Sequence, residues 1–223
     1  MTFSIVARDA SGAFGSAICS SSPAVAARCV HLADRVGGVN SQNVTDPRLG
    51  PLVLDRLRDG LSASEALGMI VERTEDIEVR QLLVVDDQGR AAAYSGPRAL
   101  GVFGDAVGDG VAAGGNMLAA AGIPQVMLDA FGRTAGDLEW RLLAALRAAI
   151  DAGGEAGPVH SAGLAVVRDA GWRVTDLRVD WADDGPIDEL EKLVGMWMPQ
   201  RDDYVTRALH PAAAPSYGVP GSE

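Results

Sequence analysis

The sequence contains few of the residues that build disulfide frameworks and metal sites. Of its 223 residues, two are cysteines, Cys19 and Cys29, and three are histidines. It has no Cys-x-x-Cys and no His-Glu-x-x-His spacing, which zinc sites commonly use. Two cysteines also make no disulfide framework. We therefore expect neither a metal ion nor a cofactor.

Positive charge is also scarce. The chain has 19 basic and 30 acidic side chains, a formal net charge of −11, and Lys192 is its single lysine. A nucleic-acid-binding surface needs a basic stripe, and a membrane-surface helix needs clustered lysines and arginines. The arginines here are scattered singly among acids. We expect no nucleic acid and no membrane as partners, which leaves small molecules and proteins.

Long apolar runs are absent as well. No run approaches the about 20 residues that span a bilayer, and residues 1–9 lack the basic-then-apolar layout of a signal peptide. These features predict a cytoplasmic location. The hydrophobic fraction of 48% and the charged fraction of 22% are typical of a folded globular protein, which excludes disorder throughout the chain.

The hydrophobic pattern predicts strands that arrive as hairpins and helices that arrive in pairs. In residues 2–8 the apolar Phe3, Ile5 and Ala7 recur every second residue, as on one face of a strand. The other expected strands cover residues 13–19, 37–43, 80–85, 90–94, 161–167 and 172–181. Helices are expected over residues 46–60, 62–71, 124–131, 138–150 and 186–197. This order favours an α+β protein with two antiparallel sheets and helices outside them.

The domain organisation follows from the same pattern. We expect one domain over residues 1–198. Residues 199–223 contain scattered prolines and show no clear periodicity, so they are expected to form an extended tail.

Thr2 is the first candidate for chemistry. If Met1 is removed, Thr2 carries a free α-amine, whose ordinary pKa of about 7.7–8.0 lies close to neutral pH. Such an amine can take the proton of the hydroxyl on the same residue and later give it to a leaving amine. One residue at a strand end would then supply both nucleophile and base.

Other segments offer alternatives. Cys19 could act as a nucleophile with His31 or His160 as base, although a small buried cysteine more often fills a core. The segments 40–43 (NSQN) and 114–116 (GGN) carry backbone and side-chain amides that could donate to an oxyanion. Either segment could equally be an ordinary turn.

Several segments together resemble the Ntn-hydrolase-like proteins of domain-of-unknown-function family 1028. The similarity spans nearly the whole chain in the same order. The matching segments are TFSIVAR (2–8), SSSPAVAAR (20–28), SQN (41–43), LGP (49–51), RQL (80–82), GNML (115–118), HSAG (160–163), DLRVD (176–180), YVTRAL (204–209) and PSYGVPG (215–221).

The resemblance implies a four-layer α-β-β-α sandwich in which an N-terminal residue attacks an amide carbonyl. Thr2 then occupies the nucleophile position, and Asn40 and Asn116 are expected to assist it in catalysis. We expect a small-molecule amide as the substrate and a homo-oligomer as the assembly. The residues expected to bind the substrate are Ser4, Arg28, Ser41, Gln42 and His160.

One feature departs from the wider superfamily. Its proteasome-type members use a lysine near the nucleophile, and Lys192 lies instead on the last expected helix. Arginine cannot replace that lysine as a proton acceptor, because its pKa exceeds 12. The α-amine must then act as the base, with Arg8 or Arg28 giving electrostatic help. The alternative is a catalytically inactive protein of the same fold that binds a metabolite or serves in an assembly.

Overall fold

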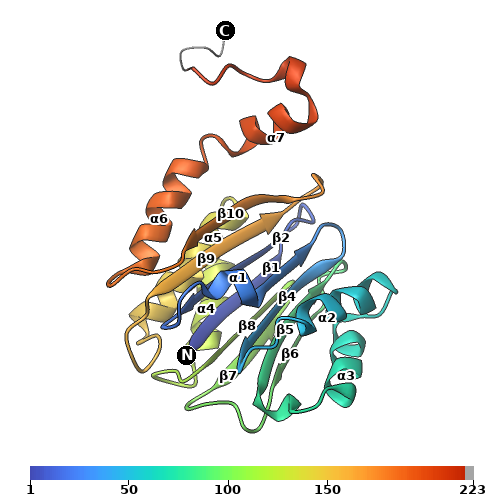
Figure 1. The fold of residues 1–223 in the computed structure, drawn as a ribbon, viewed down its shortest axis with the longest axis vertical. Helices are drawn as coiled ribbons and strands as arrows, with labels where there is room; N and C mark the ends of the chain where they lie inside the picture. Colours follow the sequence, from blue (N-terminus) through green and yellow to red (C-terminus); the bar gives the residue numbers. More distant parts are fainter. Residues whose placement is uncertain (219–223) are drawn as a thin grey trace.

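In the computed structural model, which describes residues 1–218, ten strands form two antiparallel sheets (Figure 1). The larger sheet has the order β10-β9-β2-β1-β8-β7 and the smaller one β3-β4-β5-β6. The strands are β1 (Thr2–Arg8), β2 (Phe14–Ser20), β3 (Val30–Ala33), β4 (Gly37–Asn43), β5 (Arg80–Asp86), β6 (Ala91–Ser95), β7 (Gly104–Gly108), β8 (Val111–Asn116), β9 (Ser161–Val167) and β10 (Arg173–Val179).

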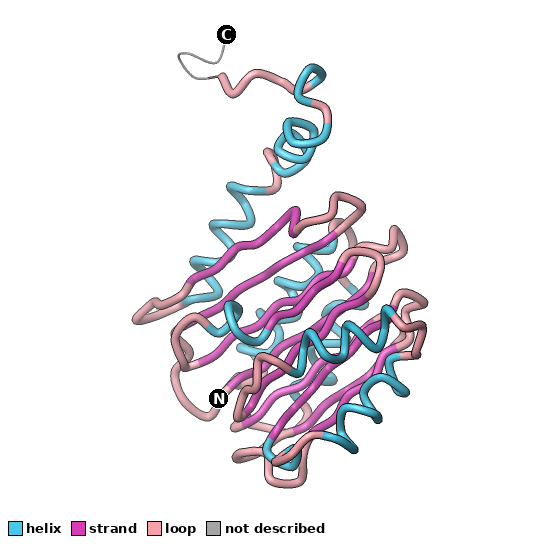
Figure 2. Tube along the Cα trace, turned by 45° about the vertical axis from the view of Figure 1, so that its right-hand side comes forward, coloured by secondary structure: helices cyan, strands magenta, loops and turns pink. Residues whose placement is uncertain are grey.

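Helices cover the outer face of each sheet (Figure 2). The larger sheet packs against α4 (Ile123–Arg133), α5 (Leu138–Asp151) and α6 (Pro186–Trp197). The smaller sheet packs against α2 (Leu49–Arg58) and α3 (Ala63–Arg73). The remaining helices are α1 (Val25–Cys29), α7 (Arg201–Leu209) and the 3-10 turns η1 (Ile77–Val79) and η2 (Pro211–Ala213). The predicted four-layer α-β-β-α sandwich is therefore confirmed.

Strand β1 lies inside the larger sheet and is buried on both faces. It pairs with β2 on one side and with β8 on the other. Phe3, Ile5 and Ala7 pack among the helices α4 and α5. Because successive side chains of a strand alternate, Thr2 and Ser4 face the smaller sheet.

The layer between the two sheets is apolar at one end of β1 and polar at the other. At the Arg8 end, Val6 packs against Phe14 and Leu83. The sheets approach closely there, since a Cβ built on Gly38 would lie 2.6 Å from the Val6 Cγ2. At the Thr2 end the layer holds buried hydroxyl and amide side chains. The first residue of β1 thus starts in a polar region of the interior.

The C-terminal part differs from the expectation. The prediction of an extended tail is wrong for residues 201–209, which form α7 beyond the β10 edge (Figure 1). The buried Arg201 fixes this helix by donating to Glu139 of α5 at 3.0 Å. Residues 219–223 of the expected tail lie outside the described residues. Among residues 1–218, no helix has the length and apolar character needed to cross a membrane.

Candidate active site

Thr2 begins β1 with its side chain almost fully buried. It is 5% exposed, and in the strand register it lies opposite Asn116 of β8. Its hydroxyl oxygen lies 3.3 Å from the Ser20 Oγ at the end of β2. The pairing of β1 with both neighbours fixes the position of this hydroxyl.

Two hydroxyl groups converge on the carbonyl oxygen of Met1. Thr2 Oγ1 donates to this oxygen at 2.5 Å, and Ser20 Oγ donates to it as well. The carbonyl group of the Met1–Thr2 amide is therefore hydrogen-bonded by two hydroxyls. One belongs to Thr2, the candidate nucleophile, and the other to Ser20 on the adjacent strand β2.

The Ser20 hydroxyl belongs to a chain of donors that starts at Arg28. The Arg28 guanidinium donates to Ser22 Oγ at 2.6 Å, and Ser22 Oγ lies 2.9 Å from Ser20 Oγ. Because the single proton of Ser20 goes to Met1, Ser22 must be the donor in its pair with Ser20. Each bond strengthens the next in such a chain. The expected electrostatic role of Arg28 thus has a physical route to the carbonyl.

Asn116 carries an unused hydrogen-bond acceptor. Its Nδ2 donates to Gln81 at 3.3 Å, whereas its buried Oδ1 has no hydrogen-bond partner within the described chain. From the sequence we expected a donor of hydrogen bonds at this position. The side chain instead has an unused oxygen on the residue opposite Thr2.

Ser4, Asn40 and Gln42 form a saturated network between the sheets. Ser4 donates to Gln42 Oε1 at 2.6 Å and accepts from Asn40 Nδ2 at 2.9 Å. Gln42 Nε2 donates to Gln81 Oε1 at 2.8 Å, and Gln81 also receives the bond from Asn116. With their polar atoms used in this way, these residues hold β1 against β4 and β5. The geometry gives them the role of support for Thr2.

Glu155 is a carboxylate that the sequence analysis did not single out. It is 5% exposed and pairs through the backbone with Leu118, just beyond β8. Its Oε2 accepts from the Ser21 amide at 3.3 Å, whereas its Oε1 has no partner among residues 1–218. Burial raises the pKa of Glu155 to about 7, against the opposing effect of the positive terminal ammonium of Met1. A carboxyl group that titrates near neutral pH thus lies close to the start of β1.

Two expected substrate-binding residues do not join this group. Ser41 alternates with Asn40 and Gln42 along β4, and its hydroxyl donates to the Asp46 carbonyl at 3.0 Å. The His160 ring is stacked on Trp181, and its Nδ1 lies 2.9 Å from the Ala182 carbonyl oxygen. Only the His160 backbone reaches the site, where its amide donates to the Ser20 carbonyl at 2.9 Å.

The alternative nucleophile Cys19 is enclosed in the core. It points to the helix-covered face with Phe3 and Leu146. Burial raises the pKa of its thiol, and the negative charge of Glu155 raises it further. A thiol held in its neutral form is a poor nucleophile, so the structure argues against the Cys19 alternative.

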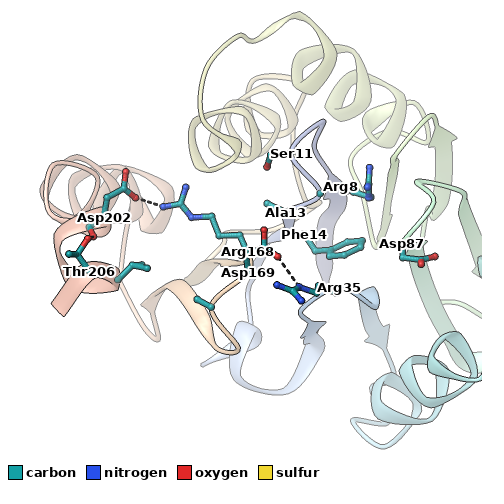
Figure 3. A pocket seen from close by; sticks show the side chains of 13 residues that line it. Arg8, Ser11, Ala13, Phe14, Arg35, Asp87, Arg168, Asp169, Asp202 and Thr206 are labelled. Atoms are coloured by element: carbon teal, nitrogen blue, oxygen red, sulfur yellow. Dashed lines mark hydrogen bonds and ion pairs between the residues drawn. The ribbon is translucent and has the colours of Figure 1, made fainter. Parts of the chain in front are cut away.

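A cavity of about 630 Å³ lies at the opposite end of β1, near Arg8 (Figure 3). Seven strand residues separate the two ends by about 20 Å. Figure 3 shows that Arg35 and Arg168 are ion-paired there, to Asp169 and Asp202 respectively. The buried polar groups around Thr2, among them Ser20, Asn116 and Glu155, do not line this cavity.

The model of a family described as "Family of unknown function (DUF1028)" matches residues 2–190. The chain belongs to this family. A crystal structure of a DUF1028 protein from Silicibacter pomeroyi is similar, with a TM-score of 0.85 and 31% identity over 92% of this chain and 90% of that one. No curated protein matches the chain.

Two further solved structures are more distant. Anbu (ancestral beta-subunit) from Yersinia bercovieri has a TM-score of 0.41 and 11% identity, covering 89% of this chain and 95% of that one. The Anbu (Gly-1) mutant from Hyphomicrobium sp. strain MC1 has a TM-score of 0.45 and 11% identity, covering 90% and 96%. Likenesses at this level say nothing about the activity of the DUF1028 chain.

Sequence reasoning missed Ser20, Ser22, Gln81 and Glu155. Ser20 and Ser22 stand in a run of three serines at the end of an expected strand, which was a usable signal. Gln81 is a polar residue within an otherwise apolar strand, which indicates a buried partner. Glu155 gives no such signal, because it lies in a glycine-rich loop.

Proposed function

We propose that, once Met1 has been removed, this DUF1028 protein is an N-terminal-nucleophile hydrolase of C–N amide bonds, with Thr2 as its nucleophile. The observation that carries the proposal is the convergence of the Thr2 and Ser20 hydroxyls on one carbonyl oxygen. A substrate carbonyl in that region would meet a nucleophile from one strand and a hydrogen-bond donor from the next.

The reaction needs water as its only co-reactant. Thr2 Oγ1 forms a bond to the carbonyl carbon while the Thr2 α-amine takes the hydroxyl proton. The C–N bond then breaks, and the amine gives this proton to the leaving nitrogen. Water attacks the resulting ester, which releases the acid and restores the Thr2 hydroxyl.

The developing negative charge falls on the carbonyl oxygen, where Ser20 donates. A preorganised donor aimed at such an oxygen is worth roughly 3–4 kcal/mol in comparable sites. The positive charge of Arg28 polarises the Ser22 hydroxyl, which in turn polarises the Ser20 hydroxyl. This makes Ser20 a stronger donor to the carbonyl oxygen. This arrangement supports Arg28 as an electrostatic aid that does not itself transfer a proton.

The α-amine has an acceptor available as well. Removal of Met1 converts the Thr2 amide nitrogen into an amine with additional N–H groups, and the unpartnered Asn116 Oδ1 lies on the residue opposite. In this proposal the oxygen accepts a hydrogen bond from the new amine and holds it beside the hydroxyl of its own residue. Lys192, in contrast, is exposed on α6 and paired with Glu189 at 2.6 Å.

Acylation of Thr2 by a small β-lactone tests the proposal without knowledge of the substrate. The lactone opens on a nucleophilic hydroxyl, so intact mass should show one adduct that maps to Thr2. We expect Thr2→Ser to keep the adduct and Thr2→Ala to lose it, with Thr206→Ala on α7 as the matched control. If the lactone leaves Thr2 unmodified, or if Thr2→Ala is labelled equally, the catalytically inactive binding or assembly protein is the correct description.

The proposal also covers where the protein is located in the cell and whether its chains associate. We infer a cytoplasmic homo-oligomer that acts on a small amide. In support of assembly, α6, α7 and the segment after them expose apolar side chains, with Met196 59% and Tyr217 57% exposed. Size measurement by light scattering should give a multiple of the 23.1 kDa chain mass, and a monomer would remove the oligomer from the proposal.

A further inference from the structure

We propose that the substrate is an amide of an α-amino acid with a free α-amino group, and that Met1 marks the place of its acyl half. This inference rests on the proposed function and names the class of substrate for the same site. Met1 is itself an α-amino acyl group in amide linkage beside Thr2. Its carbonyl accepts hydrogen bonds, the charge of its ammonium acts on Glu155, and its side chain lies near Gly157.

The carbonyl of Met1 meets the catalytic hydroxyls. Its oxygen accepts bonds from Thr2 Oγ1 and Ser20 Oγ. The carbonyl carbon of Met1 is covalently bonded to the Thr2 nitrogen. The Thr2 hydroxyl is hydrogen-bonded to the oxygen of the same carbonyl group. An ester on Thr2 Oγ1 would therefore keep its acyl chain in the same region.

The positive charge of the Met1 ammonium acts on Glu155, although the two groups form no ion pair among the described residues. Glu155 is placed near Met1 by its bond from the Ser21 amide, next to Ser20, and by Gly157 of the same loop, which lies beside the Met1 side chain. This carboxylate is 5% exposed, and its Oε1 has no hydrogen-bond partner within the described residues. The positive charge of the Met1 ammonium acts on it and lowers its pKa, against the effect of burial. Loss of Met1 takes this charge away from the place that Met1 occupied. A buried carboxylate with an unused oxygen next to the site is then suited to bind the ammonium of a substrate.

The side chain of Met1 meets Gly157. A Cβ built on Gly157 would lie 3.4 Å from the Met1 Cε and 3.7 Å from its Sδ. Met1 is half-buried, so its unbranched side chain lies in a partly enclosed space. A methyl group at position 157 would touch the end of the Met1 side chain, and a branched side chain would fill the space that an acyl residue about as long as methionine occupies.

These contacts predict discrimination against blocked amino groups. An N-acetylated substrate carries no positive charge and adds an acetyl group where Glu155 lies. The unused oxygen of Glu155 would then receive no hydrogen bond from an ammonium, which weakens binding of the blocked substrate. The chemistry is the amide hydrolysis given above, in which an α-amino acid and an amine are released and one water is consumed.

Hydrolysis of paired p-nitroanilides tests this inference. With purified protein that lacks Met1, we expect kcat/KM for methionine p-nitroanilide to exceed that for N-acetylmethionine p-nitroanilide by at least about tenfold, the effect of about 1.4 kcal/mol. Glu155→Gln keeps the shape but removes the charge, so the ratio should fall toward one. Glu75→Gln, at an exposed turn after α3, should leave the ratio unchanged.

Position 157 offers a second and independent variant. Gly157→Val should lower kcat/KM for methionine p-nitroanilide by about tenfold or more while affecting alanine p-nitroanilide little. Binding of L-methionine, measured by calorimetry against N-acetyl-L-methionine, gives a readout that does not depend on turnover. We expect only the free amino acid to bind, and Glu155→Gln to abolish the difference.

The outcomes separate the two proposals. If β-lactone labels Thr2 but the blocked substrate is cleaved equally well, or the ratio survives Glu155→Gln, the amino-acyl inference is wrong and the hydrolase proposal stands. If β-lactone does not label Thr2, the hydrolase proposal fails and the inference fails with it.

Discussion

At the scale of single residues, Glu155 has the most consequential environment. The pKa of its carboxyl is raised from 4.5 to about 7, chiefly by burial. Between pH 4.5 and about pH 7, the Glu155 carboxyl has lost its proton in the unfolded chain and still carries it in the folded chain. Stability therefore falls as the pH rises from about 4.5 to about 7 and is level above that. The contribution of this shift to the free energy of unfolding amounts to about 3.5 kcal/mol at most, at about 1.4 kcal/mol per pKa unit.

Glu155→Gln should remove this dependence. The variant cannot titrate at this position, so its free energy of unfolding relative to the parent protein should increase from pH 4.5 to pH 7. Urea unfolding at a series of pH values measures the difference, with Glu75→Gln as the control. A difference that is flat over this range would mean that Glu155 titrates normally in the folded chain.

Some of these single residues could be placed from the sequence, and others could not. The period of two in residues 2–8 predicts that Thr2 and Ser4 share a face, and the structure places both toward the smaller sheet. The same alternation, applied to residues 40–42, predicts that Ser41 lies on the opposite face of the strand from Asn40 and Gln42. In the structure its hydroxyl donates to the Asp46 carbonyl, outside their network. Glu155 could not be predicted, because its position depends on the path of a loop across the end of another strand.

At the scale of elements, the two sheets depend on a close contact between β1 and β4. A methyl group on Gly38 would lie 2.6 Å from Val6 and 3.0 Å from Leu32. Gly38→Ala should therefore destabilise the protein by about 1–3 kcal/mol through overpacking. Thermal unfolding of the purified variant measures this loss.

Gly68 provides the matched control for Gly38→Ala. It lies on the exposed side of α3, and an added Cβ meets no atom within 4 Å. Gly68→Ala should stabilise the protein by about 0.5–1 kcal/mol, because alanine is the better helix former. If both variants changed stability in the same direction, the close approach of the sheets would not be the cause.

Elements with strong local signals were predictable, whereas one element that depends on distant contacts was not. The Ser62–Glu65 pair starts α3 as a capping box with both of its bonds, a signal that is local in sequence. Helix α7 has a polar sequence with little apolar periodicity. Its place is set by the bond from Arg201 to Glu139, which lies 62 residues earlier, and no local pattern contains that information.

At the scale of the whole molecule, the ion pair between Arg201 and Glu139 joins α7 to the sandwich. The two side chains are 8% and 2% exposed, and Glu139 also accepts from Thr175 at 2.7 Å. Arg201→Met leaves a buried carboxylate without its counter-charge, so we expect a loss of about 3–5 kcal/mol. Chemical denaturation measures it, and Arg133→Met, at the exposed end of α4, should have little effect.

A second change checks the cause of that loss. Glu139→Gln in the Arg201→Met background removes the unpaired charge and should recover most of the stability. No recovery would show that α7 is held mainly by its apolar contacts, such as Val205 against the core.

The chemistry of the whole chain depends on the state of its first residue. Intact mass spectrometry of the protein purified under native conditions measures this state directly. We expect a mass lower than that of the full sequence by one methionine residue, with Thr2 as the new N-terminus. A protein that keeps Met1 throughout would have no α-amine on Thr2, and this would contradict the proposed nucleophile and base.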